Sequence, residues 1–257
     1  MLNFEQIKDY LPKEIVQRNP KGALTEYLQH EFLDAIFKQE GAELLSFMGG
    51  TAIRIIYNSQ RFSEYLDFDN FGLDYADFKR LMEKAFRELK LKGFEAEMRL
   101  LKKEEVFHGY IKFPLILQQY GLKAHHQEKI FIALDAQKKE KLFVPEIKPL
   151  NKFGIFRNIA VNPLPVLLAQ KLMAILQRKR ERGRDFYDVS FLAGLTQPDY
   201  AYIQQIIGLE KGEFKEKLLK KCSTLNYKAL ARDVMPFLFN AEQADRVLNF
   251  PATLKIL

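Results

Sequence analysis

Apolar residues recur at helical spacing in two segments of the first half of the chain. From 24 to 39 they share one helical face, and a second amphipathic helix is predicted from about 74 to 91. Residues 94–100 alternate between apolar and polar, as is typical of a strand, and 107–117 and 129–136 are also predicted strands. Helices and strands without a regular βαβ repeat predict an α+β domain built on a short mixed β-sheet flanked by helices.

The second half of the chain has a different pattern. Pro145, Pro149, Pro163 and Pro165 interrupt it, and almost every segment after Pro165 has helical periodicity. We therefore predict two domains, an α+β domain of residues 1–160 and a helical domain of residues 161–257. The predicted helices of the second domain span about residues 165–182, 185–195, 198–208, 212–222, 226–239 and 241–249.

A pair of glycines lies between a predicted strand and a predicted helix. Leu44–Met48 is a buried apolar run, Gly49 and Gly50 predict a sharp turn, and Thr51–Tyr57 is expected to begin a helix. Glycines let the backbone approach a phosphate closely, and a helix start presents unpaired N–H groups at the positive end of the peptide dipole. The segment therefore predicts an anion site.

Two polar residues near this turn each have two interpretations. Arg54, one turn into the predicted helix, either contacts a phosphate or pairs with a carboxylate. Ser63 either caps the backbone or contacts a phosphate.

Three aspartates are candidate metal ligands. Because side chains alternate along a strand, Asp67 and Asp69 are expected on one face, roughly 6 to 7 Å apart, where they can share Mg²⁺ with a triphosphate. Asp135 ends the apolar run 130–134 and is a candidate third ligand that also orients or deprotonates an attacking hydroxyl. Alternatively, Asp135 opens a turn at the end of a strand.

The helical half contains further candidates. Lys171 falls within an apolar helical stripe, so its side chain either snorkels to solvent or holds its charge on a nucleotide phosphate. Asp185 and Asp188 lie on one face of the next helix, directly after Arg184. These three residues either hold the Lys171 helix in place or touch the nucleotide, or the two acids only cap their own helix.

Composition narrows the class of partner. The 257 residues carry a net charge of +7, which favours a polyanion such as nucleic acid. The single cysteine excludes an intrachain disulfide, and no apolar run approaches the length of a membrane span. The N-terminus lacks the pattern of a signal peptide, so a cytoplasmic protein without membrane partners is expected.

Several segments in order resemble the AbiEii/AbiGii toxin family of DNA-polymerase-beta-like nucleotidyltransferases. They are Gly-Gly-Thr-Ala-Ile-Arg at 49–54, Arg-Phe-Ser-Glu-Tyr-Leu-Asp-Phe-Asp at 61–69, Lys-Leu-Met-Ala-Ile-Leu-Gln-Arg at 171–178 and Arg-Asp-Phe-Tyr-Asp at 184–188. The resemblance is specific in residues 47–73 and 169–192. It implies a nucleotidyltransferase α+β core with an attached helical domain.

The resemblance also implies an activity. Members of the family transfer a nucleoside monophosphate from an NTP, with Mg²⁺, to an acceptor such as the 3′ end of tRNA, and a cognate antitoxin is an expected partner. By family role, Gly49, Gly50 and Thr51 bind the triphosphate and Asp67 ligates the metal. Lys171 contacts phosphate, and Arg184 with Asp185 or Asp188 completes the site.

One position departs from the family pattern. The family usually has Asp-Leu-Asp after Arg-Phe-Ser-Glu, whereas this chain has Tyr65, Leu66 and Asp67. A neutral phenol is a poor ligand for Mg²⁺. The leading hypothesis is therefore a nucleotidyltransferase toxin that acts on RNA or protein. The alternatives are a catalytically degenerate nucleotide- or RNA-binding protein of this fold and a nucleotidyltransferase that modifies an antibiotic-like small molecule.

Overall fold

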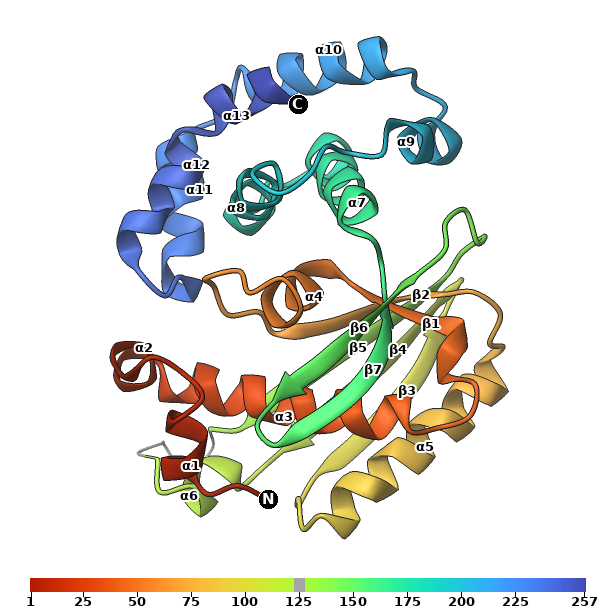
Figure 1. The fold of residues 1–257 in the computed structure, drawn as a ribbon, viewed down its shortest axis with the longest axis vertical. Coiled ribbons are helices and arrows are strands. Elements are labelled where there is room, and N and C mark those ends of the chain that lie inside the picture. Colours follow the sequence, from red (N-terminus) through yellow and green to blue (C-terminus); the bar gives the residue numbers. More distant parts are fainter. Residues whose placement is uncertain (123–127) are drawn as a thin grey trace. The chain divides into compact units, whose positions relative to one another are not determined.

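The computed structural model describes residues 1–122 and 128–257, which form two compact units. Unit 1 consists of Met1–Ile56, Ser63–Lys141 and Glu146–Val161, and unit 2 of Tyr57–Phe62, Leu142–Pro145 and Asn162–Leu257. Figure 1 follows the chain through both units. Two short segments from the first 160 residues thus belong to unit 2.

A seven-stranded mixed sheet forms the centre of unit 1, in the order β3-β4-β5-β2-β1-β7-β6. The strands are β1 (Leu45–Met48), β2 (Tyr65–Asn70), β3 (Glu97–Lys103), β4 (Val106–Phe113), β5 (Ile130–Lys138), β6 (Glu146–Lys152) and β7 (Ile155–Val161). The pairs β1–β7 and β2–β5 are parallel, and the other neighbours are antiparallel. The predicted α+β class with a mixed sheet is confirmed.

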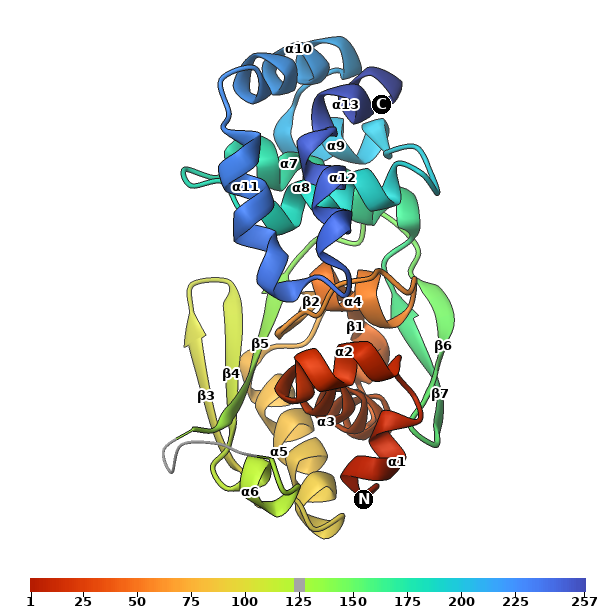
Figure 2. The same cartoon turned by 90° about the vertical axis from the view of Figure 1, so that its left-hand side faces the viewer.

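Two long helices cover one face of this sheet. Helices α3 (Pro20–Phe37) and α5 (Tyr75–Leu91) pack against each other (Figure 2). Phe37 of α3 contacts Phe68 of β2 at a ring distance of 6.2 Å, and Phe78 of α5 contacts Phe107 of β4 at 5.3 Å. We call the opposite side of strands β2 to β5 the outer face. Along β5, the even-numbered residues 130–136 are buried towards the helices, and the odd-numbered residues 131–137 belong to the outer face.

The described residues of unit 1 also form four shorter helices and a 3₁₀ turn. They are α1 (Phe4–Lys8), α2 (Lys13–Arg18), α4 (Gly49–Ile55), α6 (Ile116–Gln119) and the turn Ala42–Leu44. Helix α4 follows β1 directly and packs on β2.

Several predicted elements differ from the structure. The sequence pattern does not predict β6 and β7, and Pro149 obscures β6 because proline cannot donate to a sheet ladder. Proline is tolerated here since β6 is the last strand in the sheet order. The predicted strand 107–117 ends at Phe113, and its last residues begin α6.

Unit 2 is helical. Its helices are α7 (Leu164–Gln177), α8 (Gly183–Leu192), α9 (Tyr200–Ile207), α10 (Lys211–Cys222), α11 (Tyr227–Val234), α12 (Asp245–Leu248) and α13 (Phe250–Ile256), with 3₁₀ turns at Met235–Phe237 and Ala241–Ala244. Helix α8 packs on α7, α11 and α12. No helix in the described part of the chain is long and apolar enough to cross a membrane.

The segment Tyr57–Phe62 is bound into unit 2 by backbone hydrogen bonds. The Phe62 N–H donates to the carbonyl of Phe237 at 2.8 Å, and the Phe239 N–H donates to the carbonyl of Gln60 at 2.9 Å. The segment is therefore held by an isolated antiparallel bridge between Arg61 and Leu238.

Candidate active site

The glycine pair opens helix α4 instead of forming a separate turn before it. The helix begins at Gly49, so the prediction of a turn followed by a helix from Thr51 is wrong by two residues. Gly49 has a φ of +75°, and a Cβ at this position would lie 2.3 Å from Oδ2 of Asp67. The carboxylate of Asp67 therefore lies directly against the first residue of the helix, and only glycine leaves room for it.

Thr51 ties α4 to strand β2. Its hydroxyl donates to the backbone carbonyl of Tyr65, and its side chain is buried. This bond fixes the first turn of the helix relative to the strand that carries Asp67. Gly50 is also buried in this turn.

Three ionisable side chains cross the outer face in one row, which we call the acid row. Asp67 of β2 pairs in register with Asp135 of β5, and Asp135 pairs with His108 of β4. Residues in register on neighbouring strands share a face and lie about 4.8 Å apart. Nδ1 of His108 lies 2.6 Å from Oδ1 of Asp135. Asp67 thus has a second carboxylate beside it, and that carboxylate is held by a histidine.

Asp69 lies two residues further along β2, on the same face as Asp67. It is opposite Ser46 of β1 and Gln137 of β5 and is only 1% exposed. The structure thus separates the predicted acid pair by environment, since Asp67 is half-buried and Asp69 is fully buried.

The acid row fits a magnesium ion that is shared with a substrate. Among residues 1–122 and 128–257, no three His, Cys, Asp or Glu side chains form a group that could hold a metal ion on their own. The predicted ligands Asp67, Asp69 and Asp135 are therefore not such a group. Mg²⁺ is usually held by one or two carboxylates together with phosphate and water oxygens. Asp67 and Asp135 can supply the carboxylates, and an NTP can supply the phosphate oxygens.

Arg54 pairs with a carboxylate, the second of its two predicted arrangements. Its Nε and Nη2 lie 2.8 and 3.1 Å from the two carboxylate oxygens of Glu26, and both side chains are buried. Lys152 contacts the same carboxylate at 2.8 Å. Burial favours the neutral acid, but Arg54 and Lys152 outweigh it and lower the pKa of Glu26 to about 2. Arg54 therefore anchors α4 to α3.

Ser63 lies immediately before β2. Its backbone carbonyl accepts a hydrogen bond of 2.9 Å from the side chain of Gln29 on α3. The contact positions the start of the segment that leads to Asp67.

The candidate residues of the helical half form a buried charge network within unit 2. Nζ of Lys171 lies 3.0 Å from Oδ1 of Asp185 and 2.8 Å from Oδ2 of Asp188. Arg178 also pairs with Asp185. Burial disfavours the charged lysine, but the two aspartates outweigh it and raise the pKa of Lys171. Lys171 therefore meets anions in the helical unit and does not merely snorkel to solvent.

Arg61 completes the network, and its role is missed by the sequence pattern. Its Nε and Nη2 each lie 2.6 Å from the carboxylate of Asp188, in a bidentate pair. Burial alone would raise the pKa of Asp188, but Arg61 and Lys171 hold it below its ordinary value. The only available signal is that Arg61 begins a segment that resembles the family, because the two residues are 127 positions apart.

Arg184 lies half-buried at the start of α8. Its guanidinium carbon is 4.6 Å from the centre of the Phe237 ring, a cation–π contact. The contact links the start of α8 to the turn after α11.

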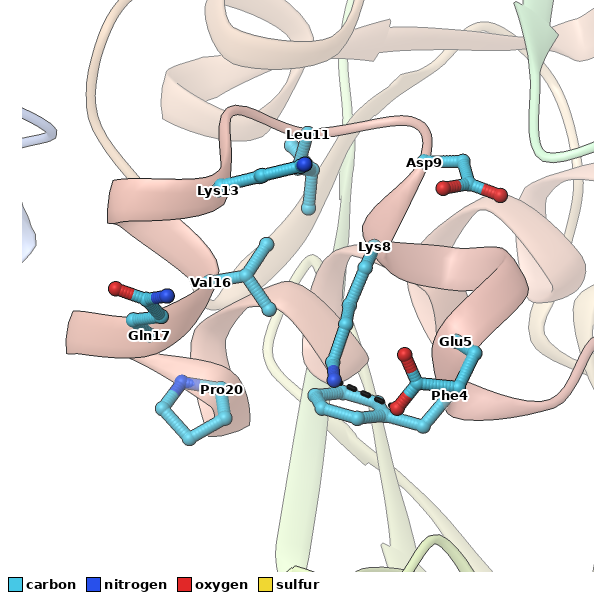
Figure 3. A pocket seen from close by; sticks show the side chains of 9 residues that line it. All are labelled: Phe4, Glu5, Lys8, Asp9, Leu11, Lys13, Val16, Gln17 and Pro20. Carbon is cyan, nitrogen blue, oxygen red and sulfur yellow. Dashed lines mark hydrogen bonds and ion pairs between the residues drawn. The ribbon is translucent and has the colours of Figure 1, made fainter.

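A cavity of about 640 Å³ lies elsewhere, between α1 and α2. Figure 3 shows Lys8 extended over Phe4 to reach Glu5, at 2.6 Å. None of the predicted site residues lines it. This cavity is therefore separate from the acid row.

Comparison with known proteins identifies the family of the chain and its fold. The family described as nucleotidyl transferase AbiEii toxin, type IV TA system, matches residues 31–249. No curated protein sequence matches the chain significantly.

Two solved structures share the fold. MenT4, a nucleotidyltransferase toxin from Mycobacterium tuberculosis H37Rv, is 16% identical, with a TM-score of 0.64 over 100% of this chain and 91% of that chain. JHP933 from Helicobacter pylori is 16% identical, with a TM-score of 0.56 over 89% of this chain and 90% of that chain. At this identity the likeness concerns the fold. Because the family match spans most of the sequence, the chain belongs to the AbiEii nucleotidyl transferase toxins of type IV toxin–antitoxin systems.

Proposed function

We propose that the chain transfers a nucleoside monophosphate from an NTP, with Mg²⁺, to an RNA acceptor such as the 3′ end of tRNA. The observation that carries the proposal is the position of Asp67, which lies against the glycine start of α4 and in register with Asp135. A carboxylate beside a close-approach glycine can hold a metal at the point where a triphosphate meets backbone N–H groups.

Each side chain has a proposed role. Asp67 and Asp135 would hold the metal, which would supply positive charge to the triphosphate and to the departing pyrophosphate. The acceptor hydroxyl oxygen forms a bond to the α-phosphorus while the bond between this phosphorus and pyrophosphate breaks. The hydroxyl proton passes to Asp135, whose carboxylate is oriented by His108. Asp69 is buried beside the row and adds a third carboxylate to this part of the sheet.

Lys171 is proposed to contact a phosphate of the nucleotide. A lysine ammonium has three donor hydrogens, and Asp185 and Asp188 accept two of them. Asp185 and Asp188 orient the ammonium, and Arg184 contributes further positive charge at the start of α8. By the family, a cognate antitoxin is the expected protein partner.

Tyr65 supports a second candidate function. It occupies the position at which the family resemblance implies the first metal-binding aspartate, and its side chain is 41% exposed on the outer face. A chain with this substitution that binds nucleotide or RNA without turnover is the second candidate.

Label transfer from each α-³²P-NTP to total RNA tests both candidates. We expect Mg²⁺-dependent labelling by the native chain and a loss on the order of a hundredfold in Asp67→Asn, because in-line transfer tolerates little misplacement. Asp77→Asn, which removes an exposed carboxylate at the start of α5, is the matched control. Labelling by Tyr65→Asp but not by the native chain favours the second candidate. Labelling of protein instead of RNA contradicts the proposed acceptor.

A further inference from the structure

A second row of side chains runs beside the acid row. Tyr65 of β2 pairs in register with Ala133 of β5, and Ala133 pairs with Tyr110 of β4. We call these three residues the tyrosine row. Each member precedes or follows a member of the acid row by two positions on its strand, so the two rows share the outer face about 6 to 7 Å apart.

The two tyrosines are exposed on either side of a small residue. Tyr65 is 41% and Tyr110 is 44% exposed, which is unusual for large aromatic side chains on a central part of a sheet. Their Cα atoms lie on strands β2 and β4, roughly 10 Å apart, with the methyl group of Ala133 between them. A flat ring can therefore lie over Ala133 and contact either tyrosine.

An aromatic contact connects the two rows. The rings of His108 and Tyr110 are nearly parallel, at an angle of 19°, with centres 6.4 Å apart. A base that stacks on Tyr110 thus lies over the strand that carries His108, the partner of Asp135.

On the side of strands β3 and β4, the charges next to the tyrosine row favour a polyanion. Arg99 of the edge strand β3 pairs in register with Tyr110 and extends the row to the edge of the sheet. The outer face of β3 and β4 carries three cations, Arg99, Lys103 and Lys112, and one acid, Glu97. Its net charge is therefore +2. Cations beside exposed aromatic rings are the pattern with which proteins bind single-stranded nucleic acid.

We propose that Tyr65 and Tyr110 form a stacking platform that binds the unpaired end of the RNA acceptor and directs its terminal hydroxyl to Asp67 and Asp135. The proposal rests on the proposed function, since it names the residues that hold the acceptor of that reaction. Every base has a π-face, so the platform accepts an end irrespective of its sequence. Tyr65 is thereby a positioning residue at the place where the family resemblance implies a metal ligand.

Binding of a fluorescent oligoribonucleotide with an unpaired 3′ end, without NTP, tests the platform. We expect Tyr65→Ala and Tyr110→Ala each to weaken binding of the full chain by about tenfold, the effect of losing one base–aromatic contact. Tyr65→Phe and Tyr110→Phe keep the ring and should bind within about twofold of the native chain. Phe156→Ala is the matched control, because Phe156 is 71% exposed on β7, away from both rows. Thermal unfolding confirms that each variant is folded.

A DNA oligonucleotide, a blunt RNA duplex and the label-transfer assay extend the test of the platform. A deoxyribonucleotide of the same sequence that shows the same tyrosine dependence supports stacking, whereas a blunt RNA duplex should bind more weakly and without tyrosine dependence. Equal effects of Tyr110→Ala and Phe156→Ala, or no binding of the oligoribonucleotide, overturn the platform. Tyrosine-dependent binding without label transfer contradicts the proposed reaction and supports the platform. If Tyr65→Ala and Tyr110→Ala both transfer label to RNA with an unchanged KM for RNA, the result supports the reaction and overturns the platform.

Discussion

The carboxylate of Asp67 lies so close to Gly49 that a Cβ on this glycine would be 2.3 Å from Oδ2. Gly49 also has a φ of +75°, a conformation that favours glycine over other residues. Two independent requirements therefore meet at one residue. The backbone must adopt a left-handed conformation, and the carboxylate must occupy the space of a side chain.

Replacing Gly49 should separate these two requirements. We expect Gly49→Ala to lower kcat/KM for label transfer by on the order of a hundredfold, because the new methyl group displaces the Asp67 carboxylate. Gly154→Ala is the control, since Gly154 has a φ of +74° but no atom within 4 Å of the added Cβ. Both variants should lose about 1–2 kcal/mol of stability through the left-handed backbone. Equal activities of the two variants would mean that the contact with Asp67 is not needed for catalysis.

The bidentate pair of Arg61 and Asp188 makes a second prediction. Asp188→Asn leaves the buried guanidinium of Arg61 without its counter-charge, and such a loss costs about 3–5 kcal/mol of unfolding free energy. Urea unfolding, followed by circular dichroism, measures this loss of unfolding free energy. Glu83→Gln should change stability by less than about 1 kcal/mol, because Glu83 and Lys79 are exposed and their charged atoms lie 3.8 Å apart. A cost for Asp188→Asn no larger than that of Glu83→Gln contradicts the importance of the network.

The packing of α8 on α11 predicts opposite effects at two helical glycines. A Cβ on Gly183 would lie 2.0 Å from the carbonyl oxygen of Leu230, whereas a Cβ on Gly212 of α10 meets nothing within 4 Å. Gly183→Ala should therefore push the two helices apart and cost about 1–3 kcal/mol or more. Gly212→Ala should stabilise the chain by up to about 1 kcal/mol, as alanine favours a helix. Thermal unfolding of both variants checks the difference in sign, and stabilisation by Gly183→Ala would contradict the packing.

Local periodicity predicts the parts of the fold that alternate or repeat within one element. The face shared by Asp67 and Asp69 follows from strand alternation, and the helix that begins near Asp74 follows from its apolar stripe. The register between β2 and β5 does not follow, because it depends on how two distant segments pair. The sequence thus identifies Asp67 and Asp135 as candidates without showing that they are direct neighbours.

Buried polar residues on α3 are a further limit of sequence patterns. Only the apolar residues of this helix predict a buried face, yet Glu26, His30 and Asp34 are buried as well. The two acids are compensated by partners from distant elements, Arg54 for Glu26 and Arg157 for Asp34, and His30 bonds to the carbonyl of Glu26 on its own helix. A periodicity argument counts these positions as solvent-exposed, because their compensating partners become neighbours only in the folded chain.

His30 provides the last prediction, a loss of stability in mild acid. Its Nδ1 donates to the carbonyl of Glu26 at 2.7 Å, and burial lowers the pKa of His30 from 6.5 to about 4. Between these two pH values the histidine is protonated in the unfolded chain but neutral in the folded chain. The contribution of His30 to the free energy of unfolding is therefore complete above pH 6.5 and is lost as the pH falls towards 4. The loss from pH 7 to pH 5 is about 2 kcal/mol.

Urea unfolding of the native chain and of His30→Gln at pH 7 and pH 5 measures this term. Glutamine keeps a donor for the Glu26 carbonyl but does not titrate, so the variant should lose about 2 kcal/mol less than the native chain between the two pH values. Glu26 does not obscure the comparison, because its pKa of about 2 in the folded chain and its ordinary value of 4.5 both lie below pH 5. The same pH dependence in both proteins would contradict a buried, neutral His30, and the acid sensitivity would then arise from other groups.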